Sequence, residues 1–105
     1  MMQANLKQMT KEVSQFTLRY KQAKIQVMMF QANQNDQQRS LYLNNMKFIE
    51  AFHYILQHLI EESRQIIIND FINMKDHQWW LNFYARSTYY RIKNKALKEL
   101  LSFFK

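Results

Sequence analysis

Glu50 and His53 have the residue types and the spacing best suited to metal binding, because Glu-x-x-His places both side chains on one face of a helix. A di-iron site built on this motif needs a second copy and two further glutamates on neighbouring helices. The sequence contains no second Glu-x-x-His, and its first helical segment offers only Glu12. We therefore expect no metal site. His53 falls on an apolar stripe, which favours a hydrogen-bonded core histidine.

Catalytic chemistry has little support elsewhere in the sequence. His58 with Glu61 and Glu62 forms the other local cluster, and no further ligands accompany it. The three histidines belong to no set of nucleophile, base and orienting group. The absence of cysteine excludes a thiolate nucleophile, and the absence of glycine excludes Gly-rich phosphate loops and nucleophile elbows. We expect a non-enzymatic protein without catalytic residues or a cofactor.

The stretch ARSTYYRIKNKALKEL, residues 85–100, is the strongest candidate for binding chemistry. It contains five cationic side chains and no acid before Glu99, with Tyr89 and Tyr90 among them. Residues 76–105 hold six Lys/Arg against two Asp/Glu, which is +4 of the net charge of +7. A basic patch of this kind attracts phosphate or acidic partners. The alternatives are a solvated helical face and, less favoured, a membrane-surface helix.

The elements that must position these residues are helices. The chain has 105 residues, which fits one domain, residues 1–105, and it has no Gly and no Pro to punctuate a set of strands. No stretch approaches the roughly 18–20 apolar residues of a membrane span, and no secretory signal is recognisable. We expect an all-α bundle of two long antiparallel helices plus a short helix and a C-terminal helix. A cytoplasmic location and no membrane partner are also expected.

Apolar periodicity predicts the individual helices. The first segment has a heptad stripe, which indicates a helix packed along its length on another: Leu6, Met9, Val13, Phe16, Tyr20, Ala23, Val27 and Phe30. Residues 33–40 are predicted as the connection, with Asp36 or Ser40 as the next N-cap. A second long helix over 41–73, a brief helix near 76–83 and a last helix over 87–104 follow. The last helix should turn five residues inward: Tyr89, Ile92, Ala96, Leu100 and Phe103.

The stretch from Arg64 to Leu101 resembles the helix-turn-helix of phage ArpU-type late transcription regulators and of sigma-factor region 4. The matching residues all lie in the basic stretch 85–100, called the basic helix below: Arg86, Ser87, Thr88, Tyr89, Tyr90, Arg91, Lys93, Lys95, Ala96, Leu97 and Leu100. The resemblance covers about a third of the chain and implies a helix-turn-helix-like portion over 64–104. The whole chain also resembles a small protein of mycoplasma-like bacteria, which implies no activity.

The turn of that resemblance departs from the family pattern. The family's glycine falls at Phe83, its preceding leucine at Asn82 and its helix-capping serine at Ala85. A small alanine of the family's first helix is met by Trp79 or Trp80, which cannot pack as closely. We therefore expect a rebuilt, degenerate turn.

Duplex DNA is the partner that the resemblance implies. The candidate contacts lie at the start of the predicted last helix and along it: Arg86, Thr88, Tyr90, Arg91, Lys93, Lys95 and Lys98. Arg91, Lys95 and Lys98 follow the spacing i, i+4, i+7 and share one face. The alternative is an interaction or structural module that keeps only the shape of a helix-turn-helix and has no nucleic-acid role.

A second apolar line on the first helix predicts self-association. These residues exceed what one neighbouring helix can bury: Leu18, Ile25, Met28, Met29 and Ala32. We expect a homo-oligomer that buries them.

Overall fold

The computed structural model describes residues 5–31, 35–76 and 78–104. Helices account for the regular structure of these residues: α1 (Leu6–Met28), α2 (Asp36–His58), α3 (Glu61–Ile67) continued by the π-helical segment η1 (Ile68–Ile72), the 3-10 turn η2 (Trp79–Asn82) and α4 (Arg86–Ser102). No strand occurs in this part of the chain. The predicted all-α class is confirmed.

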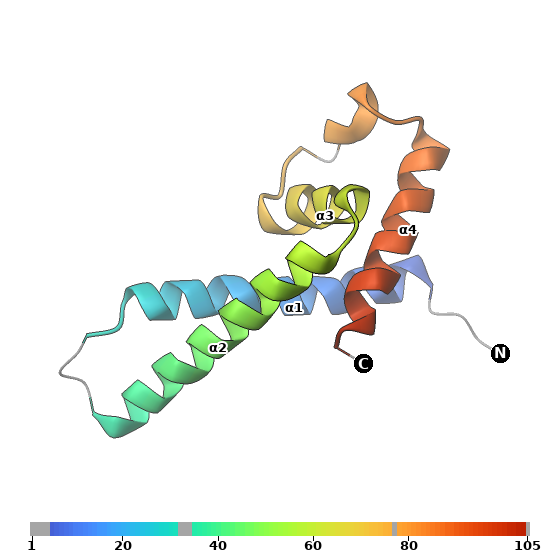
Figure 1. Ribbon diagram of the computed structural model, residues 1–105. Helices are drawn as coiled ribbons and strands as arrows, with labels where there is room; N and C mark the ends of the chain where they lie inside the picture. Colours follow the sequence, from blue (N-terminus) through green and yellow to red (C-terminus); the bar gives the residue numbers. More distant parts are fainter. Residues whose placement is uncertain (1–4, 32–34, 77, 105) are drawn as a thin grey trace.

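Helices α1 and α2 run in opposite directions and cross (Figure 1). Helix α4 and η1 pack on α1, and α3 packs on α4. The heptad stripe of α1 faces the core, where Met9, Val13 and Ala23 are fully buried. Tyr20 stacks on Phe52 of α2 with ring centroids 4.6 Å apart. The predicted pairing of two long helices is therefore present, and its core is aromatic as well as aliphatic.

Asn35 begins α2, one residue before the predicted N-cap. Its side chain accepts the Gln38 backbone N–H at 2.9 Å, and the Gln38 side chain accepts the Asn35 N–H at 3.1 Å. This reciprocal capping box satisfies two backbone donors that no helical carbonyl can reach. The prediction of Asp36 or Ser40 as the cap was wrong because the better-matched pair, Asn35 and Gln38, lies just upstream.

The predicted continuous helix over 41–73 was wrong, because the chain breaks between α2 and α3. Leu59 and Ile60 are extended, with ψ of 149° and 154°. The carboxylate of Glu99, in α4, accepts the Ile60 backbone N–H at 2.8 Å and the Ser63 hydroxyl at 2.9 Å. A distant side chain thus supplies the N-terminal cap that the residues of α3 do not provide.

The end of η1 makes a wide turn without glycine. The Asn73 N–H bonds to the Ile68 carbonyl, and the Lys75 N–H bonds to the Asn69 carbonyl at 2.9 Å. Met74 between them takes a positive φ of 49°, a conformation that glycine adopts more cheaply. The turn sends the chain outward to η2 and then back into α4.

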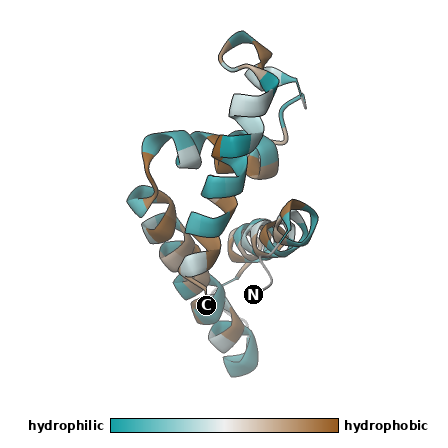
Figure 2. Cartoon of the chain, turned by 90° about the vertical axis from the view of Figure 1, so that its right-hand side faces the viewer, coloured by the Kyte–Doolittle hydropathy of each residue, from teal (hydrophilic) through white to brown (hydrophobic). Residues whose placement is uncertain are grey.

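Helix α4 closes the core. Tyr89, Ile92, Ala96 and Leu100 are buried as predicted, whereas Phe103 is 44% exposed because the helix ends at Ser102. Hydrophilic and hydrophobic colours alternate along α4 in Figure 2, as expected for a helix with one polar side and one packed side.

The molecule is elongated. Its radius of gyration is 16.0 Å and its extents are 52 × 35 × 22 Å. A compact domain of this length has a radius of gyration of about 13 Å. The end at which α1 and α2 are joined projects away from α3 and α4 (Figure 1), and this projection explains the excess.

Candidate nucleic-acid interface

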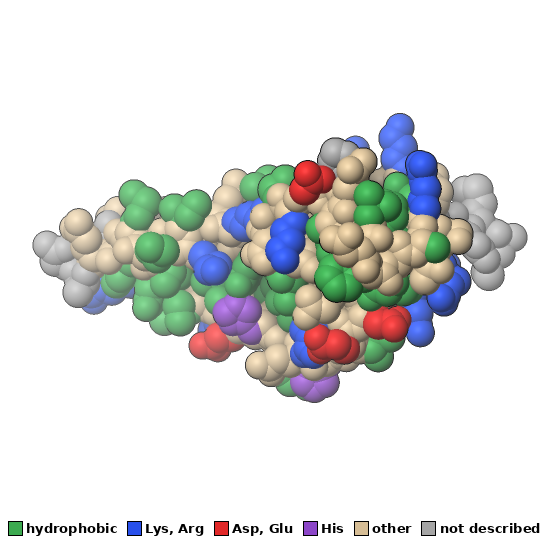
Figure 3. Space-filling view, turned by 90° about the horizontal axis from the view of Figure 1, so that it is seen from above, with side chains coloured by type: hydrophobic (Ala, Val, Ile, Leu, Met, Phe, Trp, Pro, Cys, Tyr) green, Lys and Arg blue, Asp and Glu red, His purple; other side chains and the backbone are tan. Residues whose placement is uncertain are grey.

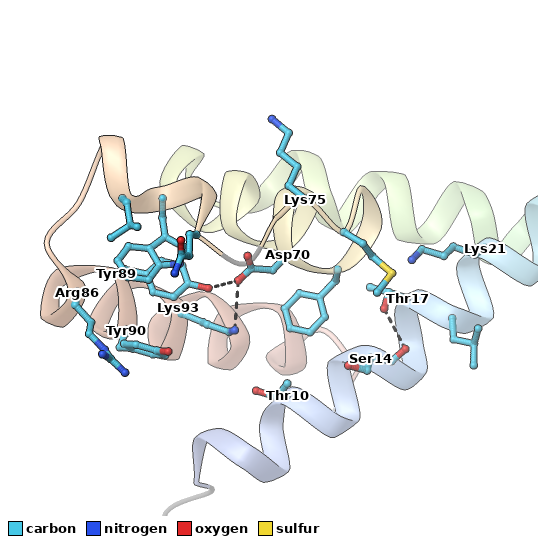
Figure 4. Close-up of a pocket in the computed structure, with 16 residues that line it drawn as sticks. Thr10, Ser14, Thr17, Lys21, Asp70, Lys75, Arg86, Tyr89, Tyr90 and Lys93 are labelled. Carbon is cyan, nitrogen blue, oxygen red and sulfur yellow. Dashed lines mark hydrogen bonds and ion pairs between the residues drawn. The ribbon is translucent and has the colours of Figure 1, made fainter.

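Asp70, in η1, positions the basic helix. Its carboxylate accepts the indole N–H of Trp79 at 2.6 Å and the hydroxyl of Tyr89, and it lies 3.3 Å from the ammonium nitrogen of Lys93 (Figure 4). The side chains of Asp70 and Lys93 are only 10% and 17% exposed. Burial, together with the hydrogen bond to Asp70, raises the pKa of the Tyr89 hydroxyl, which remains a proton donor to the carboxylate. One carboxylate thus joins η1, η2 and α4.

The turn before α4 is packed by tryptophan. The brief helix predicted near 76–83 is reduced to the four residues of η2. The Trp80 ring stacks on Tyr89 with centroids 4.3 Å apart and planes 8° from parallel. Phe83, at the family's glycine position, has a φ of −119° and needs no left-handed conformation. Aromatic stacking therefore packs this turn against α4.

The candidate cations of α4 fall on two sides of the helix. Arg91, Lys95 and Lys98 are exposed along one face, with the half-buried Thr88 in the same row. Arg86 lies on another side, where its guanidinium carbon is 5.9 Å from the centroid of Tyr90. The structure therefore brings three of the predicted cations together and separates Arg86 and Tyr90 from them.

Lys93 does not belong to the exposed set. Its ammonium group is mostly buried against Asp70 and lies 5.6 Å from the ring centroids of Phe71 and Tyr89. The sequence pattern could not reveal this pairing, because the partner is 23 residues away on another element. Its placement argues against the predicted contact with DNA, since the charge is already neutralised within the protein.

A cleft lies on the Arg86 side of α4, between α1 and the segment from η1 to α4. Its volume is about 670 Å³. Figure 4 shows Thr10, Ser14, Thr17 and Lys21 along α1, facing Asp70, Tyr89, Tyr90 and Lys93. The sequence prediction missed the α1 residues. Their spacing of 4, 3 and 4 is a recognisable polar row on one helical face.

The two histidines among the described residues, His53 and His58, lie apart from these features. His53 was interpreted as a core residue, but it is exposed. Its Nε2 is 2.7 Å from the hydroxyl of Tyr20. His58 bonds through Nδ1 to the Tyr54 carbonyl oxygen at 2.8 Å. Within residues 5–31, 35–76 and 78–104, no three His, Asp or Glu side chains cluster in a way that could hold a metal ion.

Exposed apolar side chains gather on the projecting end of the α1–α2 pair (Figure 3). Among the residues predicted for self-association, Leu18, Ile25, Met28 and Met29 are 55–83% exposed. Leu41 and Leu43 of α2 are exposed as well. Ala32 lies outside the described residues.

Comparison with known proteins returns no relative: no family model, curated protein or solved structure matches this chain. None of the described helices is both long and apolar enough to cross a membrane. Functional inference therefore rests on the geometry of this chain.

Proposed function

We propose that this is a non-enzymatic binding protein whose exposed α4 face contacts the phosphate backbone of duplex DNA. The observation that carries the proposal is an uncompensated charge. Arg91, Lys95 and Lys98 are exposed and form no ion pair with the described residues. Glu99 is the only acid of α4, and its carboxylate is occupied at the start of α3.

The dimensions of this face suit a nucleic-acid strand. Arg91 and Lys98 are seven residues apart, which is about 10 Å along a helix. Successive phosphates of one DNA strand rise about 3.4 Å, so the three cations span about three phosphates. Thr88 adds a hydroxyl to the same row, and such side chains commonly bond to phosphate oxygens.

Sequence preference should be weak. A helix-turn-helix reads bases with the first turns of its second helix, held by a short turn from the first. Here the preceding helix is one 3-10 turn, and Lys93 is engaged with Asp70. Phosphate contacts without base contacts position a protein but carry no sequence information.

Titration of a mixed-sequence duplex, followed by fluorescence anisotropy, tests the proposal. If three cations contact phosphates, log affinity should fall with the logarithm of the salt concentration with a slope of about −2.7. Replacing Arg91, Lys95 or Lys98 with glutamine should each flatten the slope by about 0.9 and weaken all duplex sequences alike.

Lys47→Gln is the matched control, because Lys47 is exposed on α2 and its replacement removes the same charge away from α4. Its slope should equal that of the unmodified protein. The proposal fails if no binding appears below about 10 µM at about 50 mM salt, which is poorer than ordinary non-specific association.

A protein-interaction role is the second candidate, and the exposed apolar end of the α1–α2 pair favours it. Met28 and Met29 are 83% and 71% exposed, beside Ile25 at 56%. Exposed apolar patches larger than a few hundred Å² commonly mark contact sites. The elongated shape leaves this end free to pair with a second copy of the chain.

Sedimentation velocity at micromolar concentration should show a dimer or larger species. Because the contact is apolar, the double variant Ile25→Gln, Met29→Gln should sediment as a monomer with unchanged helix content. Leu81→Gln, an equally exposed apolar position on η2, should still associate. A monomeric unmodified protein would remove this candidate.

A further inference from the structure

The cleft between α1 and the α4 side of the molecule has the dimensions of a small-molecule site. Its volume of about 670 Å³ falls within the range of roughly 300–1,000 Å³ that is typical of such sites. Phe71, Trp80 and Tyr89 are buried and form its floor. Its α1 wall runs from Thr10 to Lys21, about 16 Å along the helix axis.

The rim of the cleft is cationic. Lys21 extends from α1 toward the cleft, and Arg86 lies at the opposite end, while Lys75 points away from the rim in Figure 4. The one acid of the lining, Asp70, is matched by Lys93. Lys21 and Arg86 form no ion pair with the described residues. A ligand therefore meets two unpaired positive charges separated by an apolar floor.

The polar groups of the lining narrow the choice of ligand. Thr10 donates its hydroxyl proton to the Leu6 carbonyl at 2.7 Å, so its oxygen can only accept a further hydrogen bond. Tyr90 is 39% exposed and presents a ring at the Arg86 end. The aromatic wall and the hydroxyl acceptors match a flat ring that bears N–H donors. The cations at the ends match an anionic group.

We propose that this cleft binds a small organic anion built from a flat nitrogen-containing ring and a phosphate. The ring lies against Tyr90 and the floor at the Arg86 end, and Lys21 binds the phosphate at the other end. The site differs from the outward α4 face, because Arg91, Lys95 and Lys98 are absent from its lining. Its occupation does not depend on duplex DNA.

Adenosine monophosphate is a suitable probe, and ¹⁵N–¹H correlation spectra of the full chain provide the readout. Saturable shifts are expected for the Trp80 indole N–H and for the backbone amides of Ser14 and Lys21. Lys21→Gln should weaken binding by about tenfold, as expected for loss of a charge-assisted contact with the phosphate. Arg86→Gln should weaken binding less, because Arg86 lies beside Tyr90 at the ring end. Lys11→Gln removes an equal charge from an α1 position outside the cleft lining and should leave binding unchanged.

Shape is tested separately from charge with Ser14→Phe. Ser14 is exposed and its hydroxyl forms no hydrogen bond with the described residues, so a phenyl ring there should fill the cleft without unfolding the helix. Binding should disappear while the thermal midpoint is kept. Retained binding in this variant would overturn the proposal, as would the absence of saturation up to about 5 mM.

Two further titrations separate the parts of the probe. Adenosine tests the ring alone, and inorganic phosphate tests the anion alone. Both should bind more weakly than adenosine monophosphate, because each engages only part of the site. If adenosine binds as tightly as adenosine monophosphate, the cations contribute nothing to affinity. If inorganic phosphate binds as tightly as adenosine monophosphate, the ring contributes nothing. Either result would overturn the proposal.

Discussion

Replacing Asp70 with alanine is expected to lower the free energy of unfolding by about 3–5 kcal/mol, the range found when a buried ion pair loses one partner. The substitution removes the acceptor for the Trp79 indole and the Tyr89 hydroxyl, and it leaves the Lys93 ammonium without its carboxylate. Each group left unsatisfied in a buried site adds to the cost. Thermal and urea unfolding measure the loss, which should lower the midpoint by at least about 12 °C.

Variants at the same cluster show which contact dominates. Asp70→Asn keeps an acceptor oxygen but no charge, so it should lower the free energy of unfolding less than Asp70→Ala does. Lys93→Met leaves the buried Asp70 carboxylate without its cation, but Trp79 and Tyr89 still donate to it, so this variant should also cost less than Asp70→Ala. Glu50→Gln, an exposed acid on α2, is the control and should change stability by less than about 0.5 kcal/mol. A loss below about 1 kcal/mol for Asp70→Ala would contradict the role of this carboxylate.

Replacing Glu99 with alanine is expected to cost about 2 kcal/mol, less than the roughly 3–6 kcal/mol of two fully buried hydrogen bonds to a charged acceptor, because Glu99 is half-buried. The Ile60 N–H and the Ser63 hydroxyl both lose their acceptor, so the first turn of α3 should fray. Hydrogen exchange should show the loss locally, with faster exchange in α3 than in α1 or α2.

Two variants separate capping from general charge effects. Glu99→Gln retains one acceptor oxygen and should have an intermediate effect. Glu62→Ala removes an exposed acid from the first turn of α3 that interacts only with the helix dipole, so it should cost about 0.5 kcal/mol. If exchange of the Ile60 amide is the same in Glu99→Ala and in the unmodified protein, Glu99 is not the cap of α3.

The sequence by itself determined the features that depend on local pattern. A chain without Gly or Pro and with apolar residues at helical spacing could form little other than helices. The heptad stripe of α1 correctly predicted that Met9, Val13 and Tyr20 are buried, because one stripe of a helix faces the core. The extent of α4 was predicted within two residues at each end for the same reason.

The tertiary structure decided what depends on contacts between distant residues. The apolar periodicity of the sequence continues through the break at Leu59 and Ile60, and Leu59 and Ile66 on either side are both buried. No local signal therefore marked the end of α2. The cap comes from Glu99, 39 residues after Ile60, and the partner of Lys93 is Asp70. A carboxylate can satisfy a backbone donor or neutralise an ammonium group at any sequence separation, because only distance in space matters. Packing alone therefore decided which cations of α4 remain exposed.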